Sequence, residues 1–294
     1  MNQKTRRIIL GVVFTIATSY VTLSLRSKPL PNSPFFTING VAVIAHAGGK
    51  GIWPDNTLFA MERATELGVD VLEMDVHATE DGVIVLRHDE TVDATTNGTG
   101  LIREMSFSEL GKLDAAYNWT PNEEIDYPYR GQDIGVPSLE ELFVALPTMR
   151  MDIEIKQLEP SIAEPLCDLI QAYNMEANVL VASFHPHSIL EFRKACPNVA
   201  TSAVEPEVRY FYALNTILLG NIYQPRLEAF QVPEYAGDIQ VVRSRFVDGA
   251  HKHNVAVYVW TVNEPLDMEY FVGLGVDGII TDRPDLLLEV LGRD

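Results

Sequence analysis

Two short stretches of the chain place ionisable side chains inside runs that otherwise read as buried β-strands. The first carries Glu73 and Asp75, and the second carries Asp152, Glu154 and Lys156. Because side chains alternate across a strand, the ionisable residues of each stretch share one face. An unpaired carboxylate in an apolar environment costs several kcal/mol, so it normally has a partner or a metal ion. The pattern predicts a charged pocket at strand ends, which we interpret as a metal site.

The spacing of the acids suits a single hard cation. Glu73 and Asp75 point the same way with one residue between them, and Glu154 can supply a third ligand from another strand. Three carboxylates without nearby thiols favour Ca²⁺ or Mg²⁺ over zinc. The alternative is a charge network in which Lys156 neutralises the acids. One lysine cannot balance three carboxylates, so we prefer the metal site.

Two histidines are expected on the same rim. If a hairpin turns at Asp81 and Gly82 through a two-residue turn, His88 falls opposite Asp75. His46 reaches that face from the end of the first expected strand. Imidazole titrates near neutral pH, so two imidazoles that flank a metal-bound anion form a natural acid–base pair. A lone histidine is more often structural, whereas two on one rim favour catalysis.

Apolar strand patterns alternate with helical patterns along the body of the chain. The expected strands are residues 41–46, 69–76, 151–155, 179–183, 200–204, 229–232, 255–260 and 277–280. The expected helices include residues 57–67, 159–173, 187–196, 243–253, 266–274 and 284–291. Eight strands interleaved with helices predict an α/β fold, a (β/α)8 TIM barrel, with a hairpin extension of the second strand and a small insertion at 114–137. A doubly wound open sheet is the alternative, but no Gly-x-Gly-x-x-Gly turn follows a strand.

The same residues carry a family resemblance that runs in order from about residue 41 to the end. The motifs are Val43-Ile44-Ala45-His46-Ala47-Gly48-Gly49, Trp53-Pro54-Asp55-Asn56-Thr57, Glu73-Met74-Asp75, His88-Asp89, Glu154-Ile155-Lys156, Val259-Trp260-Thr261-Val262-Asn263 and Gly275-Val276-Asp277-Gly278-Ile279-Ile280-Thr281-Asp282-Arg283-Pro284. Together they resemble glycerophosphodiester phosphodiesterases. The resemblance implies a (β/α)8 barrel that hydrolyses glycerophosphodiesters to sn-glycerol 3-phosphate and an alcohol with a divalent cation.

Carried over residue by residue, the resemblance assigns a role to each part of the expected site. It makes His46 and His88 the acid–base pair, Lys156 a phosphate contact and Trp260 a wall of the substrate pocket, and it agrees with the strand-face argument for the metal ligands Glu73, Asp75 and Glu154. Phe184 is expected to line the pocket as well. The expected supporting residues are Asp55, Asn56, Glu205 and Asp282.

The chain departs from the family pattern directly after the first histidine. The family usually has arginine there, and this chain has Ala47, which removes a bidentate phosphate donor. Lys50, Arg87 and Arg283 are the candidates to replace it. The family's Pro-Glu-Asn-Thr is also changed, since Asp55 has a shorter stem than glutamate. Neither change touches the expected metal ligands or histidines.

Composition limits the partners. The formal net charge of −19 argues against nucleic acid or a strongly anionic membrane surface as the main partner. The expected substrate, a small-molecule glycerophosphodiester or lysophospholipid, is what the family resemblance implies. The two cysteines, Cys167 and Cys196, exclude a disulfide framework and a thiolate cluster, although one disulfide is compatible with the sequence. We favour Cys167 as a free, buried helix residue.

The N-terminus differs from the body. Lys4, Arg6 and Arg7 precede an uncharged run from Ile8 to Leu25, which as a helix would span about 27 Å. We expect residues 1–28 to be a signal anchor, with a cleaved signal peptide as the rival; residues 29–39 to be a linker; and residues 40–294 to be the barrel domain. The barrel is then expected outside the cytoplasm, anchored to the membrane, or secreted if the helix is cleaved.

Two rival functions accompany the phosphodiesterase prediction. A lysophospholipase D would use the same chemistry on lysophospholipids, and the expected anchor and the aromatic stretch 210–212 motivate it. A membrane-tethered binding protein without catalysis is motivated by Ala47. Comparison of glycerophosphocholine with lysophosphatidylcholine separates the first two, and release of glycerol 3-phosphate excludes the third.

Overall fold

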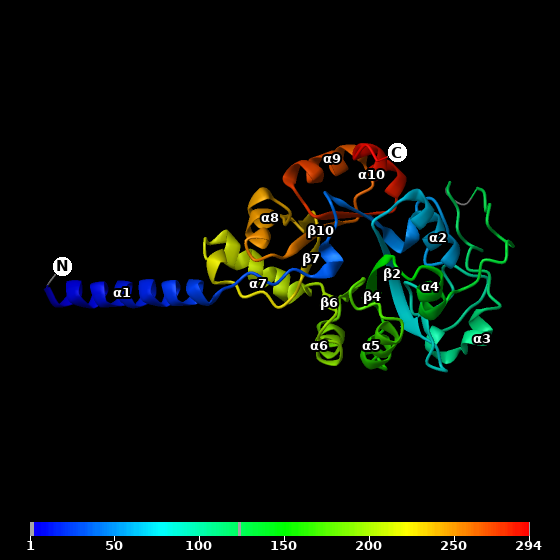
Figure 1. Ribbon diagram of the computed structural model, residues 1–294, viewed down its shortest axis with the longest axis horizontal. Helices are drawn as coiled ribbons and strands as arrows, with labels where there is room; N and C mark the ends of the chain where they lie inside the picture. The colour runs from blue at the N-terminus through cyan, green and yellow to red at the C-terminus, as the bar shows by residue number, and fades with distance from the viewer. Residues whose placement is uncertain (1–2, 123–124, 294) are drawn as a thin grey trace.

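The computed structural model of the chain describes residues 3–122 and 125–293 and forms a parallel β-barrel with helices around it (Figure 1). The eight barrel strands are β1 (Ala42–Ala45), β2 (Val71–Ala78), β4 (Arg150–Ile155), β5 (Val179–Ala182), β6 (Ala200–Thr201), β7 (Ala229–Pro233), β10 (Ala256–Trp260) and β11 (Gly278–Thr281). They pair in the order β6-β5-β4-β2-β1-β11-β10-β7. A parallel bridge from Ser202 to Ala229 joins β6 to β7 and closes the ring. The predicted (β/α)8 barrel is confirmed.

The helices cover the outside of the barrel and bury the outward faces of its strands. They are α2 (Leu58–Leu67), α4 (Leu139–Ala145), α5 (Ala163–Ala172), α6 (Pro186–Ala195), α7 (Glu205–Thr216), α8 (Ser244–His251), α9 (Pro265–Leu274) and α10 (Pro284–Val290). Local signals set their ends: the Thr57 hydroxyl accepts from the Ala60 N–H at the start of α2, and Gly68 ends that helix at φ 95°. The aromatic stretch 210–223 lies in α7 and the following turn η4 (Gly220–Ile222), where Phe211 is buried. It is an ordinary barrel segment.

The hairpin forms, but in a different register from the predicted one. β3 (Ile84–Leu86) pairs antiparallel with β2 so that Val76 faces Leu86. The Thr79 N–H donates to the Val83 carbonyl, so the turn contains residues 80–82, with Gly82 at φ 79°. A turn one residue longer than expected shifts every partner by one, and Arg87 rather than His88 lies opposite Asp75, where its N–H donates to the Asp75 carbonyl.

The chain between β3 and α4 forms a small insertion over the C-terminal end of the barrel. It contains η3 (Ile102–Glu104) and α3 (Phe107–Leu110). Its own apolar cluster comprises Val85, Val92, Ile102, Leu110, Ala115 and Val136. As predicted, the described residues between 114 and 137 include no helix or barrel strand.

The segment predicted as a linker, residues 29–39, is packed against the other end of the barrel. Its turn η1 (Pro34–Phe36) buries Phe35 beneath the strands, where Phe36 contacts Tyr258. The Leu30 N–H donates to the His253 carbonyl. The segment is therefore not a free tether, because its aromatic side chains complete the barrel core.

The N-terminal helix α1 (Gln3–Arg26) projects from that same end, away from the insertion (Figure 1). The Ser27 hydroxyl, just after it, donates to the Tyr223 carbonyl at 2.5 Å. α1 is long and apolar enough to cross a membrane.

On the outside of the barrel, Cys167 and Cys196 form a disulfide between α5 and the end of α6, so the expectation of a free Cys167 is wrong.

Candidate active site

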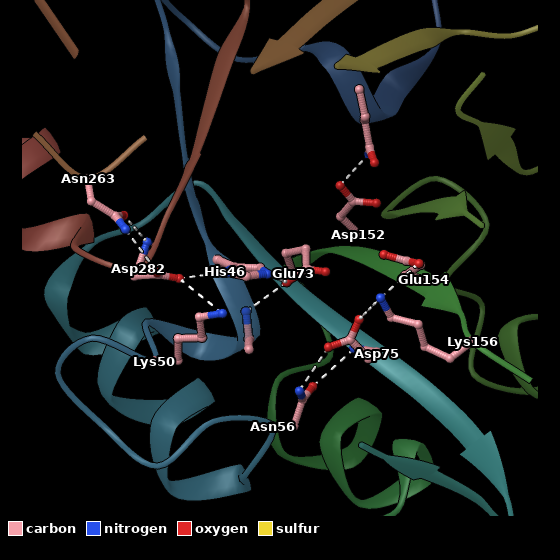
Figure 2. A network of polar contacts seen from close by, with 12 residues as sticks. His46, Lys50, Asn56, Glu73, Asp75, Asp152, Glu154, Lys156, Asn263 and Asp282 are labelled. Atoms are coloured by element: carbon pink, nitrogen blue, oxygen red, sulfur yellow. Dashed lines mark hydrogen bonds and ion pairs between the residues drawn. The ribbon is translucent and has the colours of Figure 1, made fainter. Parts of the chain in front are cut away.

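The three predicted acids lie at the C-terminal ends of two neighbouring strands and converge. Register places Asp75 of β2 beside Glu154 of β4, and Glu73 beside Asp152 one step below. Parallel partners point to the same face, so all four carboxyl groups enter the barrel interior. Glu73, Asp75 and Glu154 each present an oxygen within 4.8 Å of the others, and Figure 2 shows them around a common space.

The arrangement fits a hard divalent cation. The donors are three carboxylates, of which Asp75 is almost fully buried and Glu73 is 6 % exposed. Asn56 binds both the side chain and the backbone of Asp75. Its amide donates to Asp75 Oδ2 at 3.0 Å, and its Oδ1 accepts from the Asp75 N–H at 3.0 Å. The Ala47 N–H fixes Glu73 through Oε2 at 2.7 Å. Positioned oxygen donors with this much negative charge are what Ca²⁺ or Mg²⁺ requires.

Lys156 lies beside this cluster and pairs with two of its members. Its Nζ is 3.2 Å from Asp75 Oδ1 and 2.9 Å from Glu154 Oε1. Burial opposes a charge on this ammonium, but the two carboxylates outweigh it and raise the pKa of Lys156. Lysine neutralisation, the alternative interpretation, is thus present in part. It leaves Glu73 and Asp152 without a lysine or arginine partner among the described residues.

Burial and mutual repulsion make the carboxyl groups hard to ionise without a cation. Burial, reinforced by the charge of Asp75, raises the pKa of Glu73. Burial also raises the pKa of Glu154, against the opposing effect of Lys156. Asp152, whose pKa is raised by burial and then by Glu73, holds Gln231 through one oxygen, and its other oxygen has no partner among the described residues. Strand alternation put Asp152 on this face, but we assigned it no role.

We expect cation binding to release protons. The folded pKa values of Glu73 and Glu154 lie above their ordinary 4.5. Without a cation, the stability that these acids contribute to the fold is therefore complete only below about pH 4.5, and it is lost as the pH rises through the raised pKa values. A cation binds the ionised form of the acids, so its affinity should increase as the pH rises above about 4.5 and through their raised pKa values. Calorimetry in buffers of different ionisation enthalpy measures the protons. A pH-independent affinity without proton release would contradict the assignment.

His46 directly follows β1 and is held by a chain of hydrogen bonds. Its Nδ1 lies 2.6 Å from Asp282 Oδ1, and its Nε2 faces Glu73 Oε2 at 3.9 Å. Asn263 donates to Asp282 Oδ2 and accepts from the Asp282 N–H. Burial works against ionised Asp282, but the His46 hydrogen bond and the cations His46 and Lys50 bring its pKa below the usual range. An ionised Asp282 keeps the proton on Nδ1, which leaves Nε2 free to exchange protons at the site.

His88 follows β3 and is oriented by its neighbour. Its Nδ1 lies 2.8 Å from Asp89 Oδ1, and its side chain is 57 % exposed. The ring lines the cavity above the carboxylates although the predicted register was wrong. Each histidine thus has a carboxylate on Nδ1. Sequence reasoning gave no role to Asp89 or Asn263, although both stand in the quoted motifs.

A cavity of about 740 Å³ opens above the acids. His46, His88, Glu73, Asp152 and Glu154 line its polar part, while Asp75 lines a smaller, adjoining cavity. Phe184 and Trp260 line it with ring centroids 5.7 Å apart, and Lys156 Nζ lies 5.5 Å from the Phe184 ring. Beyond them the lining is mostly apolar: Val208, Tyr212, Val232, Pro233, Ala236, Ile239 and Val241, partly from the small hairpin of β8 (Tyr235–Ala236) and β9 (Ile239–Gln240).

Three of the expected supporting residues lie at the polar centre, and one does not. Asn56 binds Asp75 and Asp282 binds His46, while the helix cap beside Asn56 is Thr57. Asp55 lines a smaller, adjoining cavity. Glu205 lines the large cavity at the start of α7, but it is exposed and pairs with Arg209.

This (β/α)8 barrel brings together three acids that could hold a cation and two histidines that each have a carboxylate on Nδ1, an arrangement suited to a hydrolase with acid–base catalysis. The family model "Glycerophosphoryl diester phosphodiesterase family" matches residues 46–286. A glycerophosphodiester phosphodiesterase of Caldanaerobacter subterraneus subsp. tengcongensis is 35% identical and aligns with 85% of this chain and 98% of that protein. The chain belongs to the glycerophosphoryl diester phosphodiesterase family.

Two more distant proteins are also similar. Human lysophospholipase D GDPD1 is 25% identical, with 84% of this chain and 85% of that protein aligned. An Oleispira antarctica phosphodiesterase, solved with its product sn-glycerol-3-phosphate, superposes with a TM-score of 0.69 at 21% identity, covering 89% of this chain and 100% of that one. The latter likeness supports the fold.

Proposed function

We propose that this enzyme hydrolyses glycerophosphodiesters to sn-glycerol 3-phosphate and an alcohol, with a divalent cation at Glu73, Asp75 and Glu154. The observation that carries the proposal is the convergence of these acids beside His46, at two adjoining cavities that His88 also lines. Family membership supports the reaction, and the donor chemistry supports Ca²⁺ or Mg²⁺.

Each residue of the site has its own role in the proposed reaction. One histidine takes the proton of the attacking oxygen as that oxygen bonds to phosphorus. The bond from phosphorus to the alcohol oxygen breaks, and the other histidine protonates the departing oxygen. Asp282 and Asp89 hold the two rings with Nδ1 turned away from the cavity. Lys156 offers an ammonium to the phosphoryl oxygens, and a bound cation would withdraw charge from the same oxygens.

An assay of the full-length protein in detergent tests the reaction. Glycerophosphocholine is supplied with Ca²⁺ or Mg²⁺, and glycerol 3-phosphate is measured by a coupled dehydrogenase. Release that depends on the protein and the cation supports the proposal. Binding of glycerophosphocholine without any release would instead support the non-catalytic binding protein.

The apolar part of the large cavity favours a second candidate, a lysophospholipase D. Val208, Tyr212 and Ile239 extend the lining away from the carboxylates, and water-soluble diesters have no group that needs this surface. An acyl chain would gain from burial there. Against it, α1 projects from the end of the barrel opposite to the insertion that lies over the C-terminal strand ends (Figure 1). A membrane that held α1 would therefore lie away from the strand ends that carry the site. We therefore place the soluble diesters first.

Ile239→Asp should separate the two substrates. Ile239 is about half exposed, so the substitution should leave the fold intact. If the apolar lining holds an acyl chain, kcat/KM on lysophosphatidylcholine should fall about 10-fold, while glycerophosphocholine hydrolysis is unchanged. Leu190→Asp, an exposed position on α6 outside the cavity, is the matched control. An equal loss on both substrates would exclude an acyl-chain role for this lining.

We also propose that α1 anchors the barrel to the membrane from outside the cytoplasm. The length and apolar character of α1 support a membrane span, and Lys4, Arg6 and Arg7 support a cytoplasmic N-terminus. The disulfide Cys167–Cys196 supports an oxidising compartment. Protease digestion of the barrel in intact expressing cells tests the orientation, and a barrel protected until lysis would contradict it. The N-terminal sequence of the isolated protein distinguishes an anchor from a cleaved signal.

A further inference from the structure

Arg87 is a buried cation without adequate partners. It is 1 % exposed, and its Nε and Nη2 make no hydrogen bond within the described residues. Its Nη1 reaches the Asp55 carbonyl only at 3.4 Å. The nearest opposing charges are Asp55 and Asp89, which do not offset the effect of burial on its pKa. Guanidinium stays charged in proteins, so this group holds unused donors in a dry position.

Arg87 is one of the residues that line a second cavity, which joins the catalytic one. It has a volume of about 250 Å³ and shares His46 and His88 with the large cavity. Its lining includes the cationic residues Lys50 and Arg87, the acids Asp55, Asp75 and Asp89, and Ala47. The space beside the two histidines therefore holds two cationic side chains, and position 47, where the family pattern has an arginine, is part of its lining.

The turn of the hairpin is what brings Arg87 here. Directly opposed residues of an antiparallel pair share a face, so the observed register puts Arg87 on the face of Asp75. The register predicted from a two-residue turn would have placed His88 there and turned Arg87 to the other face.

We propose that Arg87 binds the phosphate of the substrate and replaces the arginine that Ala47 removed. The inference rests on the proposed phosphodiesterase function and assigns its anion contact. The other two candidates are less suitable. The Arg283 guanidinium already donates Nε and Nη2 to the two oxygens of Asp285, at 2.9 and 2.7 Å. Lys50 is more exposed and faces Asp282 at 3.8 Å. Two free N–H groups of Arg87 match the fork that a phosphate accepts.

Arg87→Met in the full-length protein tests the assignment. The substitution removes a buried, poorly paired charge and keeps an apolar stem, so the melting temperature should hold or rise. Affinity for sn-glycerol 3-phosphate and for inorganic phosphate, measured by calorimetry, should fall about 10- to 100-fold, and KM for glycerophosphocholine should rise similarly. Adding Ala47→Arg to Arg87→Met should recover most of the affinity, because the new side chain enters the same cavity.

Controls separate a binding role from a structural one. Arg283→Gln removes an arginine already satisfied by Asp285 and should change affinity by less than about two-fold. Unchanged anion affinity in folded Arg87→Met would overturn the proposal, as would a loss that Ala47→Arg does not recover. If Arg87→Met fails to fold, the same comparison is made with Arg87→Gln. Anion affinity is read without turnover, so a chain that hydrolyses no diester would refute the proposed function while still testing Arg87.

Discussion

Replacing His46 with alanine is expected to lower kcat on glycerophosphocholine by about 10²- to 10⁴-fold, with little change in KM. The imidazole is held through Nδ1 by Asp282 and presents Nε2 to the cavity above Glu73. Alanine removes the proton-transferring group and leaves the carboxylates and Lys156 in place. Steady-state kinetics on cation-loaded protein give both constants.

The matched control is His187→Ala. His187 is an exposed histidine on α6 that pairs with Glu191, and its loss should alter kcat by less than about two-fold. Asp282→Asn gives a further check. Asparagine has nearly the same shape as aspartate but no longer fixes the proton on Nδ1 of His46, so kcat should fall while the protein stays folded. If His46→Ala retained a tenth or more of the activity in a folded protein, His46 would not be a catalytic acid or base.

Removing the cation is expected to abolish hydrolysis. Three carboxyl groups within 4.8 Å of one another repel in its absence, and Lys156 reaches only Asp75 and Glu154. Protein treated with a chelator should lose activity to background and regain it with Ca²⁺ or Mg²⁺. Glu154→Gln removes one charged ligand and should raise the cation concentration needed for half-maximal activity by about 10-fold or more.

Glu164→Gln, an exposed acid at the start of α5, is the control for a general loss of charge and should leave the cation requirement unchanged. Full activity in chelator would mean that the acids serve another purpose. The charge network with Lys156 would then be the better interpretation of the cluster.

Patterns of local origin predicted most of the fold. Alternating apolar runs indicated the eight strands, and Thr57 and Gly68 marked the ends of α2, because capping and left-handed glycine act within a few residues. The length of a turn is a finer property. The hairpin register depended on whether residues 80–82 or only 81–82 form the loop, and hydrogen bonds from Thr79 and Phe107 to Asp81 favour the longer form.

Contacts between segments that are distant in the chain could not be predicted from the sequence. The packing of Phe35 beneath the barrel depends on closure of the strand ring, and the Cys167–Cys196 disulfide depends on the packing of α5 against α6. For the same reason, the sequence did not identify the hydrogen-bond partners of the acids in the site. Strand alternation was enough to predict that Glu73, Asp75 and Glu154 lie together. The hydrogen bonds from Asn263 to Asp282 and from Ala47 to Glu73 depend on the tertiary fold.

The location of a bound cation in a crystal tests the central claim most directly. Crystals soaked in Mn²⁺, which prefers the same oxygen ligands, would be measured by anomalous diffraction. We predict one peak in the cavity, within about 2.0–2.6 Å of an oxygen of Glu73, of Asp75 and of Glu154. A peak elsewhere, or none at saturating Mn²⁺ with Lys156 still bound to Asp75 and Glu154, would contradict the account.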